Sequence, residues 1–330
     1  MKYLKELNLQ MVKDARLKID KYINNTPFIK SIYLSDKDTN VFFKLETTQE
    51  VKSFKIRGAL NKMFSLTEDE KNFGVATISS GNHGASVALG AQILGIKKAV
   101  IIVPANTTTA KLNKIKYFGA EVLQMGNNYD EAHNLGTKYI EDNNLTLIDS
   151  YYDDPYIYAG QGTMVLEILE KNPNIDTIIA PIGGGGLIGG ICVAAKETNP
   201  NIKVYGVQTE ACPAMKKSLE DDFCYEEFES EDSICESLIG GVGPLAFEIC
   251  KKYLDDIFLV SEKEIRKATA FMGLRELMIV EPSSATVVAA FEKYKNKLQG
   301  KNIALVLSGA NPNAELILNI YNEYKSEYIK

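Results

Sequence analysis

Lys55 is the residue whose sequence context most directly suggests covalent chemistry. It stands in Ser53-Phe54-Lys55-Ile56-Arg57-Gly58-Ala59, a pattern that predicts an N-cap followed by a helix with a lysine in its first turn. A helix N-terminus favours the uncharged amine, and an uncharged lysine is both a nucleophile and a base, the form that a Schiff base needs. Most lysines only keep a surface soluble, so this segment by itself leaves both interpretations open.

A run of four glycines, Gly183 to Gly186, follows the apolar segment 177–182, and Leu187 then opens a helical pattern. Backbone without side chains can wrap around an anion, which the unpaired N–H groups and the helix dipole stabilise. The run predicts a phosphate site. The alternative is a tight turn between a strand and a helix, although one or two glycines would suffice for that.

A second polar loop, Ser79-Ser80-Gly81-Asn82-His83-Gly84, lies between the apolar segment 74–78 and an apolar helical pattern. Its hydroxyls and N–H groups suit a substrate carboxylate. The alternative is a cluster of capping residues with a Gly-Asn turn, in which His83 is a structural histidine.

The third polar loop, Ser308-Gly309-Ala310-Asn311, directly follows the apolar segment 303–307. A serine at such a strand end is able to make one directed hydrogen bond to the ring of a ligand. This signal is weak when it is taken alone.

The elements that must position these loops alternate along the chain. Short β-rich segments are separated by stretches of helical length, a rhythm that predicts an α/β fold with parallel sheets flanked by helices. In such a fold, ligands bind beyond the carboxyl ends of the strands, where all three polar loops are expected. The predicted strands span residues 41–45, 74–78, 99–103, 121–125, 145–149, 177–182, 203–208, 257–260 and 303–307, and the clearest helices span 108–118 and 129–141.

Composition excludes several classes of function. The 330 residues hold 43 acidic and 37 basic side chains, and the resulting net charge of -6 argues against nucleic acid and anionic membranes as partners. Residues 177–195 carry no charge, but their glycines argue against a membrane helix. Only His83 and His133 are present, which argues against a histidine-built metal site.

Two further features bear on location and surface. The five cysteines show no paired spacing and the first twenty residues contain no apolar signal core, so we expect reduced thiols in a cytoplasmic protein. Eight acidic residues gather within positions 220–232, and we interpret them as a solvated loop without an assigned role.

Four segments in order along the chain carry a resemblance to a known family: SFKIRGA, SSGNHG, the tetraglycine loop and SGAN. They resemble the pyridoxal-phosphate-dependent threonine/serine dehydratases and serine racemases, which have the two-domain tryptophan-synthase-β-like fold, or fold type II. The resemblance covers nearly the whole chain. Connecting segments match as well, at NNTPF and at residues 152–169, 254–265 and 279–291.

The resemblance assigns a role to each segment. Lys55 would form the Schiff base with pyridoxal 5'-phosphate and later act as the general base. Other residues would bind the cofactor: Phe54 packing on its ring, Asn82 bonding its 3-hydroxyl, Gly183, Gly184, Gly185, Gly186 and Leu187 holding its phosphate, and Ser308 facing its pyridine nitrogen. The substrate carboxylate would bind at Ser79, Ser80, Gly81, Asn82 and His83.

The implied reaction is β-elimination from a β-hydroxy amino acid such as L-threonine or L-serine, giving ammonia and a 2-oxo acid. The resemblance also implies a homodimer. It further implies two domains, a large cofactor-binding domain of residues 1–47 and 146–330 and a small substrate-closing domain of residues 48–145. Three alternatives stay open. They are a serine racemase with Ser80 as a second base, a dehydratase for another substrate such as 3-hydroxyaspartate, and a non-enzymatic α/β protein that binds a phosphate ligand.

The chain departs from the family pattern at several positions. Lys52 replaces a usual glycine, and residues 235–237 read Cys-Glu-Ser where relatives have Ala-Asp-Gly, so the side chain of the substrate stays open. The metal site of the racemases resembles Glu210 and the carbonyl of Ala214, but Lys216 stands where an acidic ligand is expected. A lysine ammonium repels divalent cations, so we expect no tightly bound metal.

Overall fold

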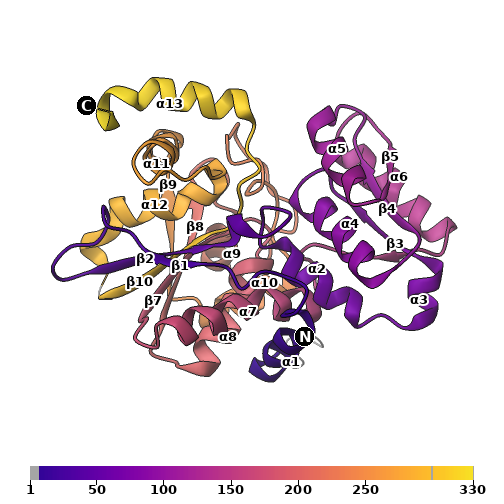
Figure 1. Cartoon of the computed structure of the whole chain (residues 1–330), viewed down its shortest axis with the longest axis horizontal. Coiled ribbons are helices and arrows are strands. Elements are labelled where there is room, and N and C mark those ends of the chain that lie inside the picture. The colour runs from indigo at the N-terminus through magenta and orange to yellow at the C-terminus, as the bar shows by residue number, and fades with distance from the viewer. Residues whose placement is uncertain (1–6, 299, 330) are drawn as a thin grey trace.

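The computed structural model describes residues 7–298 and 300–329, and its strands form two separate sheets (Figure 1). The larger sheet has the order β1-β2-β10-β7-β8-β9 and is parallel except for β1, which runs antiparallel to β2. The smaller sheet has the order β5-β4-β3-β6 and is entirely parallel. The strands are β1 (Phe28–Lys30), β2 (Asn40–Leu45), β3 (Val75–Ile78), β4 (Ala99–Val103), β5 (Glu121–Gln124), β6 (Thr146–Leu147), β7 (Thr177–Pro181), β8 (Lys203–Thr209), β9 (Asp256–Val260) and β10 (Asn302–Leu307).

Helices cover both sheets. The α-helices are α1 (Leu9–Ile19), α2 (Lys55–Phe64), α3 (Glu68–Phe73), α4 (Asn82–Leu94), α5 (Thr109–Tyr117), α6 (Tyr129–Asp142), α7 (Pro155–Lys171), α8 (Gly186–Thr198), α9 (Ala214–Asp221), α10 (Pro244–Tyr253), α11 (Glu262–Leu274), α12 (Pro282–Tyr294) and α13 (Ala314–Tyr328). Short 3-10 helices span η2 (Glu46–Thr48) and η3 (Lys295–Lys297).

The parallel α/β architecture predicted from the alternation of elements is confirmed. Each predicted strand is present with its ends shifted by at most three residues, and the uncharged stretch 177–195 forms a strand, a loop and a helix as expected. Among the described residues, no helix is long and apolar enough to cross a membrane. The strand β1 was not predicted, because its three residues are too few to show an alternating pattern.

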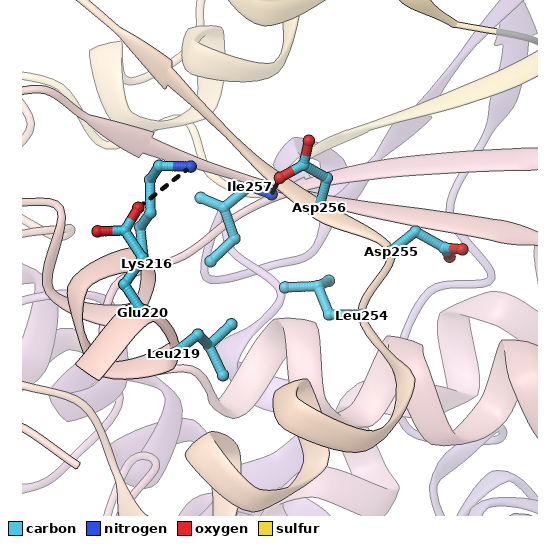
Figure 2. A pocket seen from close by; sticks show the side chains of 7 residues that line it. All are labelled: Lys216, Leu219, Glu220, Leu254, Asp255, Asp256 and Ile257. Carbon is cyan, nitrogen blue, oxygen red and sulfur yellow. Dashed lines mark hydrogen bonds and ion pairs between the residues drawn. The ribbon is translucent and has the colours of Figure 1, made fainter. Parts of the chain in front are cut away.

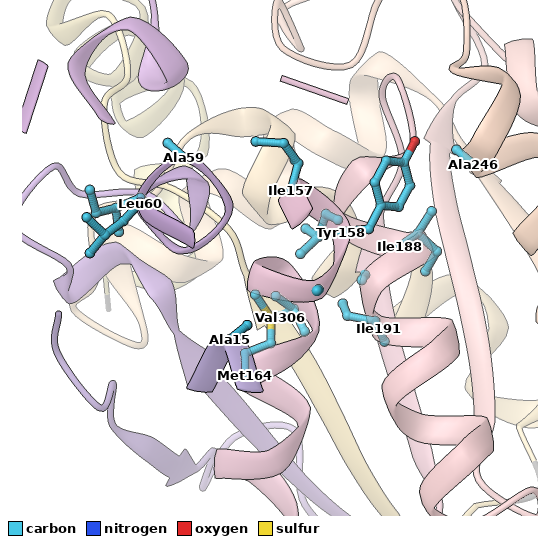
Figure 3. Close-up of a cluster of buried hydrophobic side chains, with 14 of the residues drawn as sticks. Ala15, Ala59, Leu60, Ile157, Tyr158, Met164, Ile188, Ile191, Ala246 and Val306 are labelled. Carbon is cyan, nitrogen blue, oxygen red and sulfur yellow. The ribbon is translucent and has the colours of Figure 1, made fainter. Parts of the chain in front are cut away.

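The helix α2 lies between the two sheets. It packs against α4, which covers the small sheet, and against α7, which belongs to the layer below the large sheet. Its residues Ala59 and Leu60 join Ile157 and Tyr158 of α7 in one continuous apolar core (Figure 3). The first residue of α2 is Lys55, so the packing of this core determines where the candidate nucleophile lies.

Both sheets direct their polar loops into the space beside α2. The Ser79 loop follows β3 of the small sheet, whereas the glycine loop and the Ser308 loop follow β7 and β10 of the large one. A parallel sheet places the carboxyl ends of its strands at one edge, which explains why loops distant in sequence gather there. The proposed domain boundaries at residues 47 and 145 stay a prediction.

Candidate active site

Lys55 is held at the start of α2 by the end of strand β10. The N–H of Phe54 donates to the carbonyl of Ser308 at 3.0 Å, and Ser53 forms an isolated bridge with Gly309. The N-cap of α2 is Phe54 rather than the expected Ser53, whose hydroxyl lies 3.4 Å from the Lys55 amide nitrogen. The backbone pairing therefore brings the lysine segment and the serine segment together.

The Lys55 amine lies among rings rather than beside a carboxylate. Its Nζ is 5.4 Å from the ring centre of Phe54 and 6.0 Å from that of Tyr151. Burial lowers the pKa of Lys55 to about 8, a change that the charge of Asp149 partly opposes. A substantial fraction of this lysine is therefore uncharged slightly above neutral pH, as a nucleophile or base requires.

The glycine loop is an open cradle of backbone. Gly185 caps α8 with φ +99°, and a Cβ at Gly184 would clash with the ring of Tyr151. Within residues 7–298 and 300–329, no acceptor pairs with the N–H groups of Gly184, Gly185 and Gly186. Free N–H groups at a helix N-terminus fit a phosphate.

His83 fixes the second loop to the first residues after β6. Its Nε2 lies 2.8 Å from the carbonyl of Ile148, while its Nδ1 is buried with no hydrogen-bond partner among the described residues. Burial, together with the charge of Lys55, lowers the pKa of His83 to about 4, so the imidazole is neutral. Since Nε2 must donate to the carbonyl, Nδ1 is left as an acceptor for a group that the site binds.

Asn82 is oriented by one residue that precedes α12 and one that follows β10 of the larger sheet. Its Nδ2 donates to Glu281 Oε1 at 2.9 Å, and its Oδ1 accepts from Asn311 Nδ2 at 2.5 Å. Glu281 Oε1 also accepts from the backbone N–H of Asn311 at 2.8 Å. Burial raises the pKa of Glu281 against the effect of these donors. One N–H of the Asn82 amide stays available for a ligand.

Three of the residues that build this region were missed in the sequence analysis. Glu281, Asp149 and Tyr151 lie in loops whose neighbours are distant in sequence, and only the assembled fold brings them to the site. Asn311 was identified as part of the Ser308 loop, but without a role of its own. Tyr151 connects two predicted segments, because its ring lies near Lys55 and also against Gly184. A signal was available for Glu281, which directly precedes a proline at the start of a helix.

The weak metal candidates lie apart from this group. Glu210 accepts from Lys293 Nζ at 3.1 Å, and Lys216 forms a long ion pair of 3.8 Å with Glu220. Among the described residues, no three histidine, cysteine or acidic side chains gather to hold a metal ion. All five cysteines are free.

A shallow pocket of about 240 Å³ beside Lys216 is separate from the candidate site (Figure 2). Leu219 and Ile257 form part of its apolar lining, and none of the predicted site residues lines it. The acidic segment 220–232 begins here, and ion pairs with Lys217 and Lys251 hold Asp221 and Asp222. These pairs explain part of the charge that the sequence left without a role.

Comparison with known proteins identifies the family. A family model described as "Pyridoxal-phosphate dependent enzyme" matches residues 19–309. The chain belongs to this family. It is 37% identical to an L-threonine ammonia-lyase from Thermotoga maritima, with 96% of this chain and 79% of that protein aligned. It is also 35% identical to a serine racemase from Dictyostelium discoideum, with 98% of this chain and 100% of that one aligned.

The solved structures agree with this assignment. Maize serine racemase superimposes with a TM-score of 0.88 at 29% identity, covering 98% of this chain and 99% of that chain. Threonine deaminase isoform 2 from Solanum lycopersicum gives a TM-score of 0.89 at 30% identity, covering 95% and 92%. The predicted fold type II architecture and the predicted cofactor, pyridoxal 5'-phosphate, are confirmed.

The residues present fit that cofactor. The site offers a lysine with a lowered pKa, a cradle of free N–H groups for a phosphate and two unused hydrogen-bonding atoms on His83 and Asn82. When bound, the cofactor supplies an electron sink for negative charge that develops on the α-carbon of an amino acid.

Proposed function

We propose that this protein is an ammonia-lyase that eliminates water from a β-hydroxy amino acid, L-serine or L-threonine, and releases ammonia and a 2-oxo acid. The observation that carries the proposal is the buried Lys55 amine with a lowered pKa, which lies near the rings of Phe54 and Tyr151, the latter in contact with the glycine cradle. The similarity to an L-threonine ammonia-lyase over 96% of the chain supports it.

In this proposal Lys55 first holds the cofactor and then accepts the α-proton of the substrate. An amine with a pKa of about 8 is well suited to this transfer, because this value lies close to neutral pH and the amine can therefore both accept and return a proton. Ser79, Ser80 and the N–H groups at the start of α4 bind the α-carboxylate, which orients the α-hydrogen toward Lys55. Closure of the predicted small domain, residues 48–145, on the large domain excludes water.

The cofactor contacts follow the same geometry. The glycine loop and Leu187 would hold the phosphate, Asn82 would donate its free N–H to the ring hydroxyl, and Ser308 would face the pyridine nitrogen. A neutral serine hydroxyl at that place would leave the nitrogen largely unprotonated, and the cofactor would then supply a milder electron sink that suits prompt elimination. The pairing of Phe54 with Ser308 supports placing both residues at the ring.

A second function, serine racemisation, rests on Ser80. This half-buried serine lies on the loop that carries Asn82, and its hydroxyl is suited to serve as a second base on the opposite face of the substrate. The similarity to a serine racemase over 98% of the chain supports this candidate.

One experiment distinguishes the two functions. The purified holoenzyme is incubated separately with L-serine, L-threonine and D-serine, and the 2-oxo acid, ammonia and serine enantiomers are quantified. The lyase releases pyruvate from L-serine and 2-oxobutanoate from L-threonine in equal amounts with ammonia. Accumulation of D-serine without a 2-oxo acid would instead establish the racemase, and the absence of both products would refute both proposals.

We further propose a cytoplasmic homodimer. Five free cysteines support a reducing compartment. An exposed apolar patch supports dimerisation: the side chains of Ile32, Leu277 and Ile279 are 75%, 83% and 62% exposed, and a hydrogen bond from Ser31 to Glu276 joins their two segments. Analytical ultracentrifugation tests the dimer, and a monomer at micromolar concentration would contradict it.

A further inference from the structure

The chain after β6 runs through the centre of the candidate site. The carbonyl of Ile148 accepts from His83, and the ring of Tyr151, three residues on, lies 6.0 Å from Lys55 Nζ and against Gly184. Asp149 stands between them, where the Ser79 loop, Lys55 and the glycine loop meet. No role has been assigned to this carboxylate.

The backbone holds Asp149 in one position and leaves one of its oxygens unpaired. Its Oδ1 accepts from the N–H groups of Tyr151 and Tyr152, each at 2.8 Å. Over the described part of the chain, neither a hydrogen-bond donor nor an ion-pair partner within 4.0 Å is found for Oδ2. Aspartate carries a negative charge at neutral pH, so the turn fixes an anion beside the site.

The other titratable groups nearby do not cancel this charge. His83 is neutral, because burial lowers its pKa to about 4. Glu281 is buried and bonded to Asn82 and Asn311. Lys55 is the cation on which Asp149 acts, and its amine is consumed when it holds the cofactor. Until Lys55 is released and takes up the α-proton, the site therefore contains a fixed negative charge without a cation from these side chains.

We propose that Asp149 sets the charge selectivity of the substrate site: it favours amino acids whose β-carbon bears a neutral or cationic group and disfavours those with a β-carboxylate. This inference rests on the proposed lyase function and identifies its substrate class. It favours serine and threonine over 3-hydroxyaspartate, which shares their β-hydroxyl but adds a carboxylate.

The expected size of the effect follows from Coulomb's law. Two like charges about 6 to 8 Å apart in a medium of dielectric constant about 20 repel enough to change a binding constant by roughly 30- to 100-fold. An ammonium at the same position is favoured by a similar factor. Selectivity of this size is measurable as a ratio of kcat/KM values.

The test uses Asp149→Asn, because the asparagine Oδ1 still accepts both N–H bonds and preserves the turn while the charge is lost. The matched control is Asp153→Asn, which removes the same charge from the same segment. For each holoenzyme, kcat/KM is measured with L-serine, L-threo-3-hydroxyaspartate and L-2,3-diaminopropionate, which carries an ammonium in place of the hydroxyl.

In Asp149→Asn, kcat/KM for the hydroxyaspartate relative to serine should rise about 30- to 100-fold, and the ratio for diaminopropionate should fall. Both ratios should stay within about twofold of wild type in Asp153→Asn. Unchanged ratios in Asp149→Asn, with serine turnover retained, would overturn the inference. A wild-type enzyme that releases no 2-oxo acid from serine or threonine would instead refute the proposed function.

A binding measurement keeps the inference testable if turnover of the variant is slow. L-Alanine and L-aspartate differ by a β-carboxylate and lack a β-hydroxyl to eliminate, and their dissociation constants follow from the absorbance change of the bound cofactor. The preference of wild type for alanine should shrink about tenfold or more in Asp149→Asn. Should Asp149→Asn not fold, Asp149→Ser is the second variant, since its hydroxyl also accepts an N–H bond. The same preference in the variant and wild type would overturn the inference.

Discussion

Lys55 and Arg57 are two residues apart on the same helix, yet their surroundings are opposite. Arg57 is fully buried and bonded to two carboxylates, Glu46 and Glu167, whereas no carboxylate bonds to Lys55 among the described residues. The pKa of Arg57 is raised by its partners, and that of Lys55 is lowered to about 8 by burial. One helix thus carries two kinds of cation. Arg57 is compensated, meaning that buried carboxylates pair with it in the core, and Lys55 at the candidate site is uncompensated, meaning that no carboxylate pairs with it.

The compensated region forms a closed set. The Arg57 Nε donates to Glu46 at 2.7 Å and its Nη1 to Glu167 at 2.7 Å, while Lys44 pairs with Glu167 and Thr26 donates to Glu46. Two positive and two negative side chains cancel, and each is less than 2% exposed. These contacts join β2, η2, α2 and α7, so they fix the start of α2 without taking part in chemistry.

Replacing Lys55 with alanine tests the uncompensated side and should have the largest effect. The variant should lose the absorbance band of covalently bound cofactor and at least about 10³-fold of its turnover, because the nucleophile and the base are the same amine. Absorbance spectra and 2-oxo acid release measure both losses. A variant that keeps the band and the activity would remove Lys55 from the mechanism.

Replacing Arg57 with methionine tests the compensated side. Without the guanidinium, Glu167 keeps Lys44, but Glu46 is left with hydrogen bonds from neutral donors only. A buried negative charge then lacks a cation, which should destabilise the protein by about 3–5 kcal/mol. Urea denaturation monitored by circular dichroism measures this loss. The exposed pair between Lys267 and Glu327 provides a control, since Lys267→Met should cost less than about 1 kcal/mol. Equal effects at the two positions would show that burial does not distinguish them.

The difference between these two cations was only partly visible in the sequence. The pattern around Lys55 and the order of the polar loops predicted the fold class, the strand positions and the loops that gather near the lysine. The partners of Arg57 come from η2 and α7, 11 and 110 residues away, and no local pattern reports such a pairing. Asp149 and Glu281 were missed for the same reason.

Local patterns also failed where tertiary contacts replaced a local bond. Ser53 has the residue type of an N-cap, but a bridge to Gly309 engages its backbone and Phe54 takes the cap position. A strand of three residues, β1, forms because the edge of β2 offers it a partner.

The apoprotein provides a third test, in which the sign of the effect differs between the two cations. Lys55 has a folded-state pKa of about 8 against an ordinary 10.5, so the folded protein binds fewer protons than the unfolded chain between these values. Its charge therefore opposes folding fully below pH 8, and the penalty disappears as the pH rises toward 10.5. Lys55→Met should stabilise the apoprotein by about 1–3 kcal/mol at pH 7.

Denaturation curves at pH 7, 9 and 10.5 measure this effect as the difference between Lys55→Met and wild type. Taking the difference isolates Lys55 from Lys114, whose pKa burial also lowers to about 8. The stabilisation should shrink as the pH increases. If the stability difference between Lys55→Met and wild type does not depend on pH, it arises from packing rather than from the charge. A destabilised variant would contradict the inference that the charge of Lys55 opposes folding.

The smallest effect is expected at Asn311, whose side chain is neutral. Asn311 follows β10 of the larger sheet and bonds to residues near the smaller one. It donates to Asn82 and to the carbonyl of Val51, and it accepts from Lys114 Nζ at 2.5 Å. Asn311→Ala frees the amide of Asn82 to rotate, and the half-buried Lys114 keeps its second acceptor, the carbonyl of Val51. It should therefore weaken the binding of pyridoxal 5'-phosphate to the apoprotein about tenfold, which corresponds to about 1.4 kcal/mol.

Titration of the apoprotein with cofactor, followed by fluorescence, measures the dissociation constant. The matched control is Asn313→Ala, which removes the N-cap of α13 two residues away and should reduce stability without changing cofactor affinity. If Asn311→Ala binds the cofactor as tightly as wild type does, the hydrogen bond from Asn311 is not needed to position Asn82. A tenfold loss confined to Asn311→Ala would show that the hydrogen bonds of Asn311 hold Asn82 in position for the cofactor. The ion pairs of Arg57 act in the same way on the start of α2.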